Sequence, residues 1–441
     1  MMNNPFNPNS YAHLDSDSAM IQAAVDAAAK TGEAVTIPRY NERTGQRVWN
    51  ITKEIQLYSG SVLYLDNCHL RQADGVNTCI FRNAYSETLV GRCRAGRLHH
   101  ISIIGRGNCL LDGGNSTEQA PNAPWDNSII NFINVEKVNL LNLNIANPRY
   151  AAMVFHYCAD VQIRQIDFSG NSGQDAIHVH TGCFQFMIDN ISGVIGGDVI
   201  ALENLKSYRI DLMRDGRYDD SIHNLVIRNI RCTAGKCFVR TVNHGGRKIY
   251  NVAMQNLMYD CESDPTDSRP AMGMTAADYN PIHPEIYALE QACAVCIGGE
   301  NGDEAMAQLG DTHGITIQNL TCKAPVGVRM TCTARDVLVE NVRMFAGGRT
   351  AVCVAEGVMK NIQVRDVYFA GAIAGNTPAY AICFENADAE NVLVHNLHAS
   401  KDHTAVIGGC GKANVKVTGL HKPLDTILTN AGTEAIQVVE G

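Results

Sequence analysis

The alternation of apolar and polar positions follows one short template that recurs along most of the chain. The template reads apolar, any residue, apolar, polar, then Asn or a similar residue, apolar, polar, apolar. Its copies occupy residues 138–145, 161–168, 186–193, 225–232, 252–259, 315–322, 337–344, 362–369, 392–399 and 415–422. Because successive side chains of a strand point to opposite faces, each copy predicts two short β-strands separated by a turn at the central residue.

The spacing of these copies indicates what the strands build. Many neighbouring copies begin 22 to 25 residues apart. A unit of this length is too short for a strand–helix–strand crossover and suits one coil of a parallel β-helix. Leucine-rich repeats have a similar period, but their Leu-x-x-Leu-x-Leu frame is absent. The sequence therefore predicts an all-β, single-stranded parallel β-helix, a solenoid, with residues 1–441 as a single domain.

The central residue of the template and the longer steps predict the turns and loops. Asn tolerates the left-handed backbone conformation of a turn and can bond its equivalent in the next coil, which forms a ladder. The larger steps predict loops over roughly 205–222 and 259–313, and the second of these contains four prolines. Loops of such length in a compact repeat are usually functional or disordered.

One helix is predicted before the repeat, over residues 17–31. Four apolar residues recur at helical spacing on one face: Ile21, Ala24, Val25 and Ala28. Asp17 or Ser18 is expected to cap the N-terminus, and Gly32 is expected to end the helix. Because the first coil of a solenoid exposes unpaired core, this helix is expected to cap it.

Composition excludes several function classes. The chain has 45% hydrophobic and 18% charged residues, so it is expected to be globular. Its formal net charge of −9 argues against a nucleic-acid surface, and its apolar runs are too short to span a membrane. The first residues show no signal peptide. The sixteen cysteines are interpreted as reduced core residues, which predicts a cytoplasmic protein. No motif for a cofactor or a metal ion is visible, so neither is expected.

Two carboxylates one coil apart are the main candidates for chemistry. Asp175 and Asp198 are 23 residues apart, as are His180 and Glu203. Equivalent positions of successive coils stack about 4.8 Å apart, so each pair is predicted to stack. Two like charges so close raise one pKa, which suits acid–base catalysis. Alternatively, the aspartates only bond turn amides between coils.

Four segments, in chain order, resemble the polygalacturonase family of glycoside hydrolases (family 28), which are pectin-lyase-like β-helices. They are the opening helix and first strand at 17–38, a segment at 105–114 that is similar to the family's G-x-G-x-x-x-D-G turn, the coils at 128–156, and the aspartate-bearing coils at 173–204. The resemblance covers about residues 15–260. It implies a right-handed β-helix and an inverting hydrolase whose partner is an oligosaccharide, pectic or otherwise containing uronic acids.

The family's three aspartates map only partly onto this chain. The resemblance places Asp175 and Asp198 at the two water-activating positions, whereas Gly197 occupies the position of the general acid. The family's Gly-His-Gly histidine also has no counterpart after Asn204. A hydrolase with this sequence would therefore need another proton donor.

The nearest candidate donors are expected on the outward side of the same coils. They are His178, His180 and Glu203, which have the opposite parity to core positions such as Val179. His156, one coil earlier, is a weaker donor candidate and a candidate substrate-binding residue. Alternatively, single histidines on such a face are ordinary surface residues.

Two arginines are candidates for binding a sugar carboxylate. Arg240 resembles the arginine of the family's Arg-Ile-Lys motif, although Val242 stands in place of the lysine. Arg329 in Gly-Val-Arg-Met-Thr has the same appearance. A guanidinium on an outward column can bind a carboxylate through two hydrogen bonds. Alternatively, each arginine pairs with carboxylates of neighbouring coils. The substrate groove is expected over the coils that hold Asp175, Asp198 and Arg240, with 259–313 as one wall.

Two other functions remain open at this point. The loss of the family's acid at Gly197 is what a lyase, epimerase or transferase acting on modified sugars would show. A third hypothesis is a non-catalytic sugar-binding β-helix, similar to a phage tailspike, which would bind oligosaccharides without turnover. The sequence makes no prediction of the oligomeric state.

Overall fold

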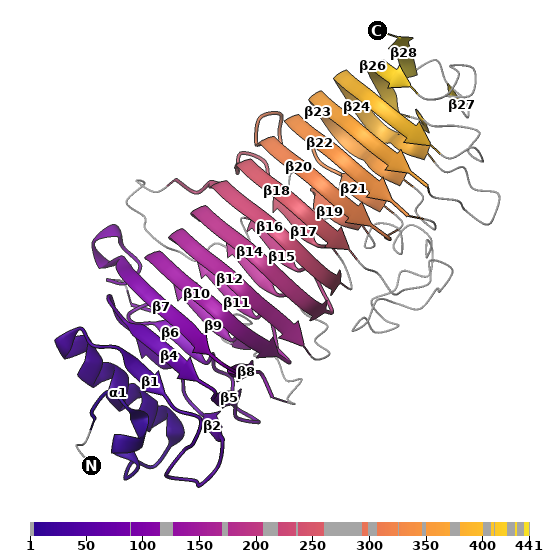
Figure 1. The fold of residues 1–441 in the computed structure, drawn as a ribbon. Coiled ribbons are helices and arrows are strands. Elements are labelled where there is room, and N and C mark those ends of the chain that lie inside the picture. The colour runs from indigo at the N-terminus through magenta and orange to yellow at the C-terminus, as the bar shows by residue number, and fades with distance from the viewer. Residues whose placement is uncertain are drawn as a thin grey trace. The chain divides into compact units, whose positions relative to one another are not determined.

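Parallel β-strands stacked in successive coils make up most of the described chain (Figure 1). The computed structural model describes residues 4–88, 90–114, 127–169, 175–205, 219–234, 237–259, 293–298, 307–324, 326–345, 350–370, 380–399, 407–409, 411–420, 428–429 and 436–440. The chain divides into two compact units: 1–195 with 208–220 is unit 1, and 196–207 with 221–441 is unit 2.

Unit 1 contains the α-helix and the first coils. Its elements are η1 (Pro8–Tyr11), α1 (Asp17–Thr31), β1 (Val35–Ile37), β2 (Val48–Ile51), β3 (Ile55–Leu57), β4 (Val62–Asp66), β5 (His69–Gln72), β6 (Phe81–Asn83), η2 (Arg94–Gly96), β7 (Leu98–Arg106), β8 (Leu110–Asp112), β9 (Ile130–Ile133), β10 (Val135–Ala146), β11 (Met153–His156), β12 (Ala159–Ser169), β13 (Ile177–His180) and β14 (Phe184–Ile195). Helix α1 packs against β1, β2 and β3, as expected of a cap on the first coil.

The N-terminus of α1 differs in detail from the prediction. The helix spans Asp17–Thr31 as predicted, and Gly32 ends it with a φ of 77°. However, its N-cap is Ser16, whose side chain accepts the Ala19 N–H, and neither Asp17 nor Ser18 fills that role. Asp17 is instead buried and forms an ion pair with Arg43 at 2.6 Å. Because the Asp17 side chain pairs with Arg43, it does not cap the helix, and the preceding residue, Ser16, is the N-cap.

Unit 2 continues the same construction. Its elements are β15 (Ile200–Asn204), β16 (Ile222–Ala234), β17 (Val239–Asn243), β18 (Ile249–Tyr259), β19 (Cys293–Ile297), β20 (Thr312–Cys322), β21 (Val326–Met330), β22 (Ala334–Met344), β23 (Thr350–Phe369), β24 (Tyr380–Ala399), β25 (Ile407–Gly409), β26 (Lys412–Leu420), β27 (Leu428–Thr429) and β28 (Ile436–Glu440). Of the predicted loops, 206–218, 260–292 and 299–306 lie outside the described residues. Strand β19 lies inside the predicted loop 259–313 and pairs with β17 and β21, so this part of the loop prediction is wrong.

The template residues stack in register within each unit. In unit 1, Val138 of β10 pairs with Val161 of β12, which pairs with Phe186 of β14. In unit 2, Val252 of β18 pairs with Ile315 of β20. These side chains are at most 2% exposed and form the interior of the coils. Because every coil repeats the same inward positions, burial of apolar area stabilises each coil against its neighbours.

The central turn of the template is confirmed at every copy. The residues there have positive φ between 52° and 67°: Asn142, Gln165, Asn190, Asn229, Asn256, Asn319, Asn341, Asp366, Asn396 and Gly419. In unit 2 the predicted ladder forms, because Asn256 donates to Asn229, Asn319 to Asn256 and Asn341 to Asn319, at 2.7–2.9 Å. A second left-handed position, five residues earlier in most coils and occupied for example by Asn251 and Asn391, was not predicted.

Candidate functional site

Unit 1 brings three histidines together at the ends of two neighbouring strands. Strand β11 pairs with β13 so that Val154 lies opposite His178 and Phe155 opposite Val179. The next positions in this register are His156 and His180, whose rings stack with centroids 4.3 Å apart and planes 6° apart. The inward neighbours Ile177 and Val179 are fully buried and set the orientation of the strand. The histidines are therefore on the side of the coil away from its core.

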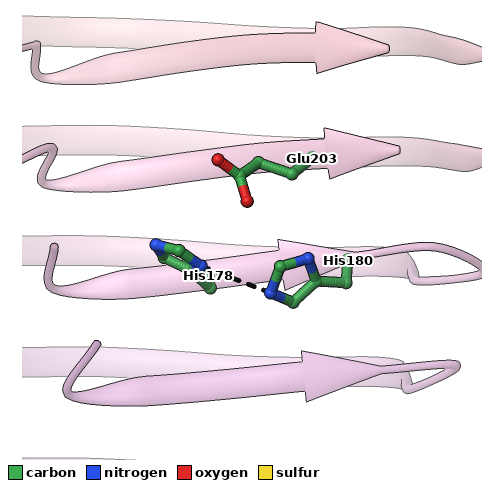
Figure 2. Close-up of side chains that lie close together, drawn as sticks. All are labelled: His178, His180 and Glu203. Carbon is green, nitrogen blue, oxygen red and sulfur yellow. Dashed lines mark hydrogen bonds between the residues drawn. The ribbon is translucent and has the colours of Figure 1, made fainter. Parts of the chain in front are cut away.

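A chain of hydrogen bonds joins Asp175 to two of these histidines. Asp175 Oδ2 lies 2.7 Å from His178 Nε2, and His178 Nδ1 lies 3.2 Å from His180 Nε2 (Figure 2, dashed line). An ionised carboxylate can only accept, so His178 donates through Nε2–H. A neutral His178 then accepts at Nδ1 from the Nε2–H of His180. This arrangement can pass a proton between the carboxylate end and His180, and the carboxylate stabilises an imidazolium at His178.

The third histidine has a different character. His156 is 1% exposed, and burial together with the charge of a protonated His178 lowers its pKa from 6.5 to about 3. It is therefore neutral at physiological pH and stacks as an uncharged ring on His180. Tyr150 closes the other side of the cluster, with its ring edge-on to His178 at 6.0 Å.

Unit 2 contains a second cluster, which consists of ion pairs between an arginine and two carboxylates. Arg240 of β17 lies opposite Ala201 of β15, and its guanidinium binds the carboxylates on either side of that residue. Arg240 Nε is 2.7 Å from Asp198 Oδ2, and Arg240 Nη2 is 3.0 Å from Glu203 Oε1. Asp198 Oδ1 also accepts the backbone N–H of Cys237 at 3.0 Å. Asp198 is fully buried, with Oδ1 in a hydrogen bond and Oδ2 in an ion pair.

These positions qualify the expectations for the site. His178, His180 and Glu203 lie on the side away from the core, but they are at most 4% exposed, so these outward positions are covered. The expected parity holds, and Figure 2 shows the three side chains projecting from β13 and β15. The stacking of Asp175 on Asp198 and of His180 on Glu203 joins residues of different units and stays a prediction.

The two arginines follow the alternative interpretation of pairing with carboxylates. Arg240 binds Asp198 and Glu203, and Arg329 of β21 binds Glu385 at 3.1 Å. Arg329 Nη1 also donates to Cys353 Sγ at 3.5 Å. Binding of a sugar carboxylate by either arginine stays a prediction.

Sequence reasoning missed several contributors to these clusters. The repeat template does not predict a role for Tyr150 or for the Cys237 amide. Tyr150 contacts His178 through the edge of its ring, and Cys237 contributes only its backbone N–H. The stacking of His156 on His180 could have been found, since the two are one coil length apart. Cys293 and Cys296 form a C-x-x-C pair that the sequence reasoning did not identify. The Cys293 sulfur lies 3.5 Å from the Cys237 sulfur.

The cysteine prediction holds for the part of the chain that the structure covers. The fourteen cysteines described are all free thiols, and all except Cys93 are buried. None of the described helices is long and apolar enough to cross a bilayer.

Comparison with known proteins supports the fold. No protein-family model and no curated protein matches this sequence. Among solved structures, the tailspike protein of E. coli bacteriophage HK620, in complex with a pentasaccharide, matches with a TM-score of 0.62 at 11% identity over 97% of this chain and 75% of the tailspike. An exopolygalacturonase from Thermotoga maritima matches with a TM-score of 0.52 at 14% identity, over 88% of this chain and 91% of the enzyme.

A third match points to the same architecture. The N-terminal fragment of gene product 12 of bacteriophage Phi29 has a TM-score of 0.52 at 13% identity, over 98% of this chain and 72% of the fragment. At such identities the likeness concerns the fold alone. The fold is a right-handed parallel β-helix with an N-terminal capping helix, as the sequence predicts.

Proposed function

We propose that the chain is a carbohydrate-active enzyme, an inverting glycoside hydrolase that cleaves oligosaccharides of pectic or related uronic-acid type. The observation that carries the proposal is the hydrogen-bonded chain Asp175–His178–His180. The resemblance of the aspartate-bearing coils to polygalacturonases supports the same reaction, and so does the exopolygalacturonase among the similar folds.

The proton donor is the part of the reaction that this cluster addresses. Hydrolysis of a glycosidic bond needs an acid for the leaving oxygen and a base for the attacking water. Gly197 removes the donor of the related family, whereas the Asp175–His178–His180 chain offers an imidazolium stabilised by a carboxylate. We assign proton donation to the leaving oxygen to His180 at one end of this chain, and removal of the proton of the attacking water to Asp175 at the other end. His178 lies between them and returns the proton from Asp175 to His180 after each turnover.

The charged cluster of unit 2 takes a positioning role in this proposal. Asp198 is fully buried, forms an ion pair with Arg240 and accepts the Cys237 N–H, so it is poorly placed to take a proton from water. We assign Asp198 and Glu203 to hold Arg240, whose side chain is 22% exposed and can meet an anionic sugar.

The proposal is tested with the full chain and a panel of pectic and other oligosaccharides. We expect new reducing ends without the ultraviolet absorbance of an unsaturated product. His178→Gln should lower the rate by about 10²–10⁴-fold, the usual contribution of general acid–base catalysis. His99→Gln is the matched control, because this exposed histidine of the same unit lies outside the cluster.

Several outcomes would contradict the proposal. An unsaturated, ultraviolet-absorbing product would identify a lyase instead. Equal loss of activity in His178→Gln and His99→Gln would remove the histidine chain from the mechanism. Tryptophan fluorescence checks that unit 1 remains folded, because both tryptophans of the sequence, Trp49 and Trp125, belong to it.

A sugar-binding protein without turnover is the second candidate. The tailspike among the similar folds was crystallised with a pentasaccharide, and the full pairing of Asp198 suits a static, charged binding surface. Calorimetric binding of an oligosaccharide that stays intact during prolonged incubation would favour this candidate over the hydrolase.

A further inference from the structure

Two cysteines of unit 2 lie side by side on neighbouring coils in a charged setting. Strand β23 pairs with β24 so that Cys353 lies opposite Cys383. Glu385 follows Cys383 by two residues, so its side chain projects from the same face of β24. The two sulfur atoms and one carboxylate oxygen all lie within 4.8 Å of one another. Two thiols and a carboxylate thus converge on one point.

This setting differs from that of a buried thiol such as Cys109. The Cys109 thiol donates a hydrogen bond to the backbone carbonyl of Asn142, and the groups around it are backbone amides and not charged side chains. Cys353, in contrast, accepts from the Arg329 guanidinium at 3.5 Å, and the same guanidinium binds Glu385 at 3.1 Å. Thiols beside charged groups are typical of metal-binding or reactive cysteines, whereas thiols acting as small apolar residues need no such neighbours.

We propose that Cys353, Cys383 and Glu385 bind one thiophilic divalent cation such as Zn²⁺, with a water molecule as the fourth ligand. Tetrahedral Zn²⁺ with bonds of about 2.3 Å to sulfur needs the two sulfur atoms about 3.8 Å apart, a separation that the observed geometry allows. Cysteine thiolates with a carboxylate are ligands that suit this ion. The site would clamp two successive coils of unit 2.

The charges of the site balance when the ion is bound. Two thiolates and the Glu385 carboxylate carry three negative charges, and Arg329 with a divalent cation carries three positive charges. Arg329 binds Glu385 through Oε2. The guanidinium then acts as an outer partner that orients the ligand.

The site also has a route for entry of the ion. Cys353 and Cys383 are 2% and 8% exposed, whereas the Glu385 side chain is 41% exposed. The carboxylate therefore lies at the protein surface with the sulfur atoms directly beneath it. An ion can reach the thiols past Glu385 without unfolding of the coils, and a water ligand can remain on the solvent side.

Cobalt absorption tests the site directly. The full chain is reduced, treated with a chelator and titrated with Co²⁺ under anaerobic conditions. We expect a thiolate-to-cobalt band that saturates at one equivalent and disappears when Zn²⁺ is added. Cys353→Ser and Cys383→Ser should abolish the band, and Glu385→Gln should weaken Co²⁺ binding by about 10–100-fold. Cys332→Ser, a buried thiol of the same unit outside the cluster, should leave the titration unchanged.

Alkylation of the unaltered protein gives a second measurement that does not depend on the folding of variants. Zn²⁺ should slow labelling of Cys353 and Cys383 by iodoacetamide, as read by mass spectrometry, and leave the partly exposed Cys93 unaffected. The proposal is overturned if saturating Co²⁺ gives no thiolate band. It is also overturned if the band requires Cys293 instead of Cys383, or if Zn²⁺ protects Cys93 and Cys383 equally.

Discussion

The histidine cluster of unit 1 and the ion-pair cluster of unit 2 lie on the same kind of coil but differ in their electrostatic roles. Around His178, hydrogen bonds link a carboxylate and two imidazoles, which can donate and accept protons. Around Arg240, two buried carboxylates bind a guanidinium that does not lose its proton. The first arrangement can move a proton, and the second holds charge in place. The β-helix thus fixes where the side chains lie, and the residue type at each site decides whether that site can transfer a proton or only holds a charge.

Breaking the ion-pair cluster should have the largest effect on stability. Arg240→Met leaves Asp198, which is fully buried, without its cation. We expect unit 2 to lose about 3–5 kcal/mol of unfolding free energy, the usual cost of an uncompensated buried charge. Hydrogen exchange of β15 and β17 peptides measures the loss in unit 2.

A matched control and a double variant sharpen this test. Arg231→Met, at an exposed position of the same unit, should change stability by less than about 0.5 kcal/mol. Adding Asp198→Asn to Arg240→Met should recover part of the loss, since one of the two buried carboxylates that Arg240 binds then carries no charge. An equal loss in the Arg240 and Arg231 variants would contradict a structural role for the cluster.

The histidine cluster should respond to pH where the ion-pair cluster does not. The pKa of His156 is about 3 in the folded chain, against 6.5 without the protein environment. Between these values the unfolded chain binds a proton that the folded chain does not. Stability is therefore full above pH 6.5 and falls by roughly 4 kcal/mol as the pH drops towards 3. Urea unfolding followed by tryptophan fluorescence reports this for unit 1.

Replacement of the buried ring provides the control. His156→Phe keeps the stack on His180 and removes the titrating nitrogens. The loss of stability between pH 6.5 and 3 should become smaller in this variant. An unchanged pH profile would mean that His156 does not titrate as assigned.

A smaller acid effect in the same unit comes from a carboxylate outside the cluster. Burial raises the pKa of Asp112, but hydrogen bonds from His69, Asn147 and the Gly114 N–H outweigh this and lower it to about 2. Because the folded pKa lies below that of the unfolded chain, stability is present above pH 3.8 and lost as the pH falls to 2. We expect a loss of roughly 1–2 kcal/mol, allowing for partial exposure of His69.

The variant Asp112→Asn separates this effect from that of His156. It should reduce the acid sensitivity below pH 3.8, where Asp112 titrates, and leave the sensitivity above that pH unchanged. Disappearance of the sensitivity near pH 5 as well would show that the two groups are coupled.

The smallest expected effect tests the backbone that both units share. Asn319 has a φ of 59° and bonds Asn256 and Asn341 in the ladder. Asn319→Ala should cost about 1–2 kcal/mol, because alanine tolerates this backbone conformation poorly and makes no ladder bonds. Asn319→Gly, which keeps the conformation, should cost less by urea titration followed by circular dichroism. A larger loss with glycine would show that conformation is not the limiting factor.

Much of this protein follows from its sequence because the coil is a local, repeated unit. The template positions, the left-handed turns at residues such as Asn256, and the helix at 17–31 depend on side-chain alternation and on the backbone preferences of Asn and Gly. These signals lie within a few residues of one another. The strand β19 was missed because it has no template copy of its own and stands between long connections.

Tertiary structure decided the partners of the charged and titratable groups. The sequence identified Arg240, Asp198, His178 and Asp175 but left open whether Arg240 would meet a substrate or neighbouring carboxylates. Pairing depends on the register between coils and on burial, which makes an unpaired charge costly. Chain alternation therefore determined which side chains leave the core, and only the stacking of coils decided that Arg240 binds Asp198 and that His180 covers His156.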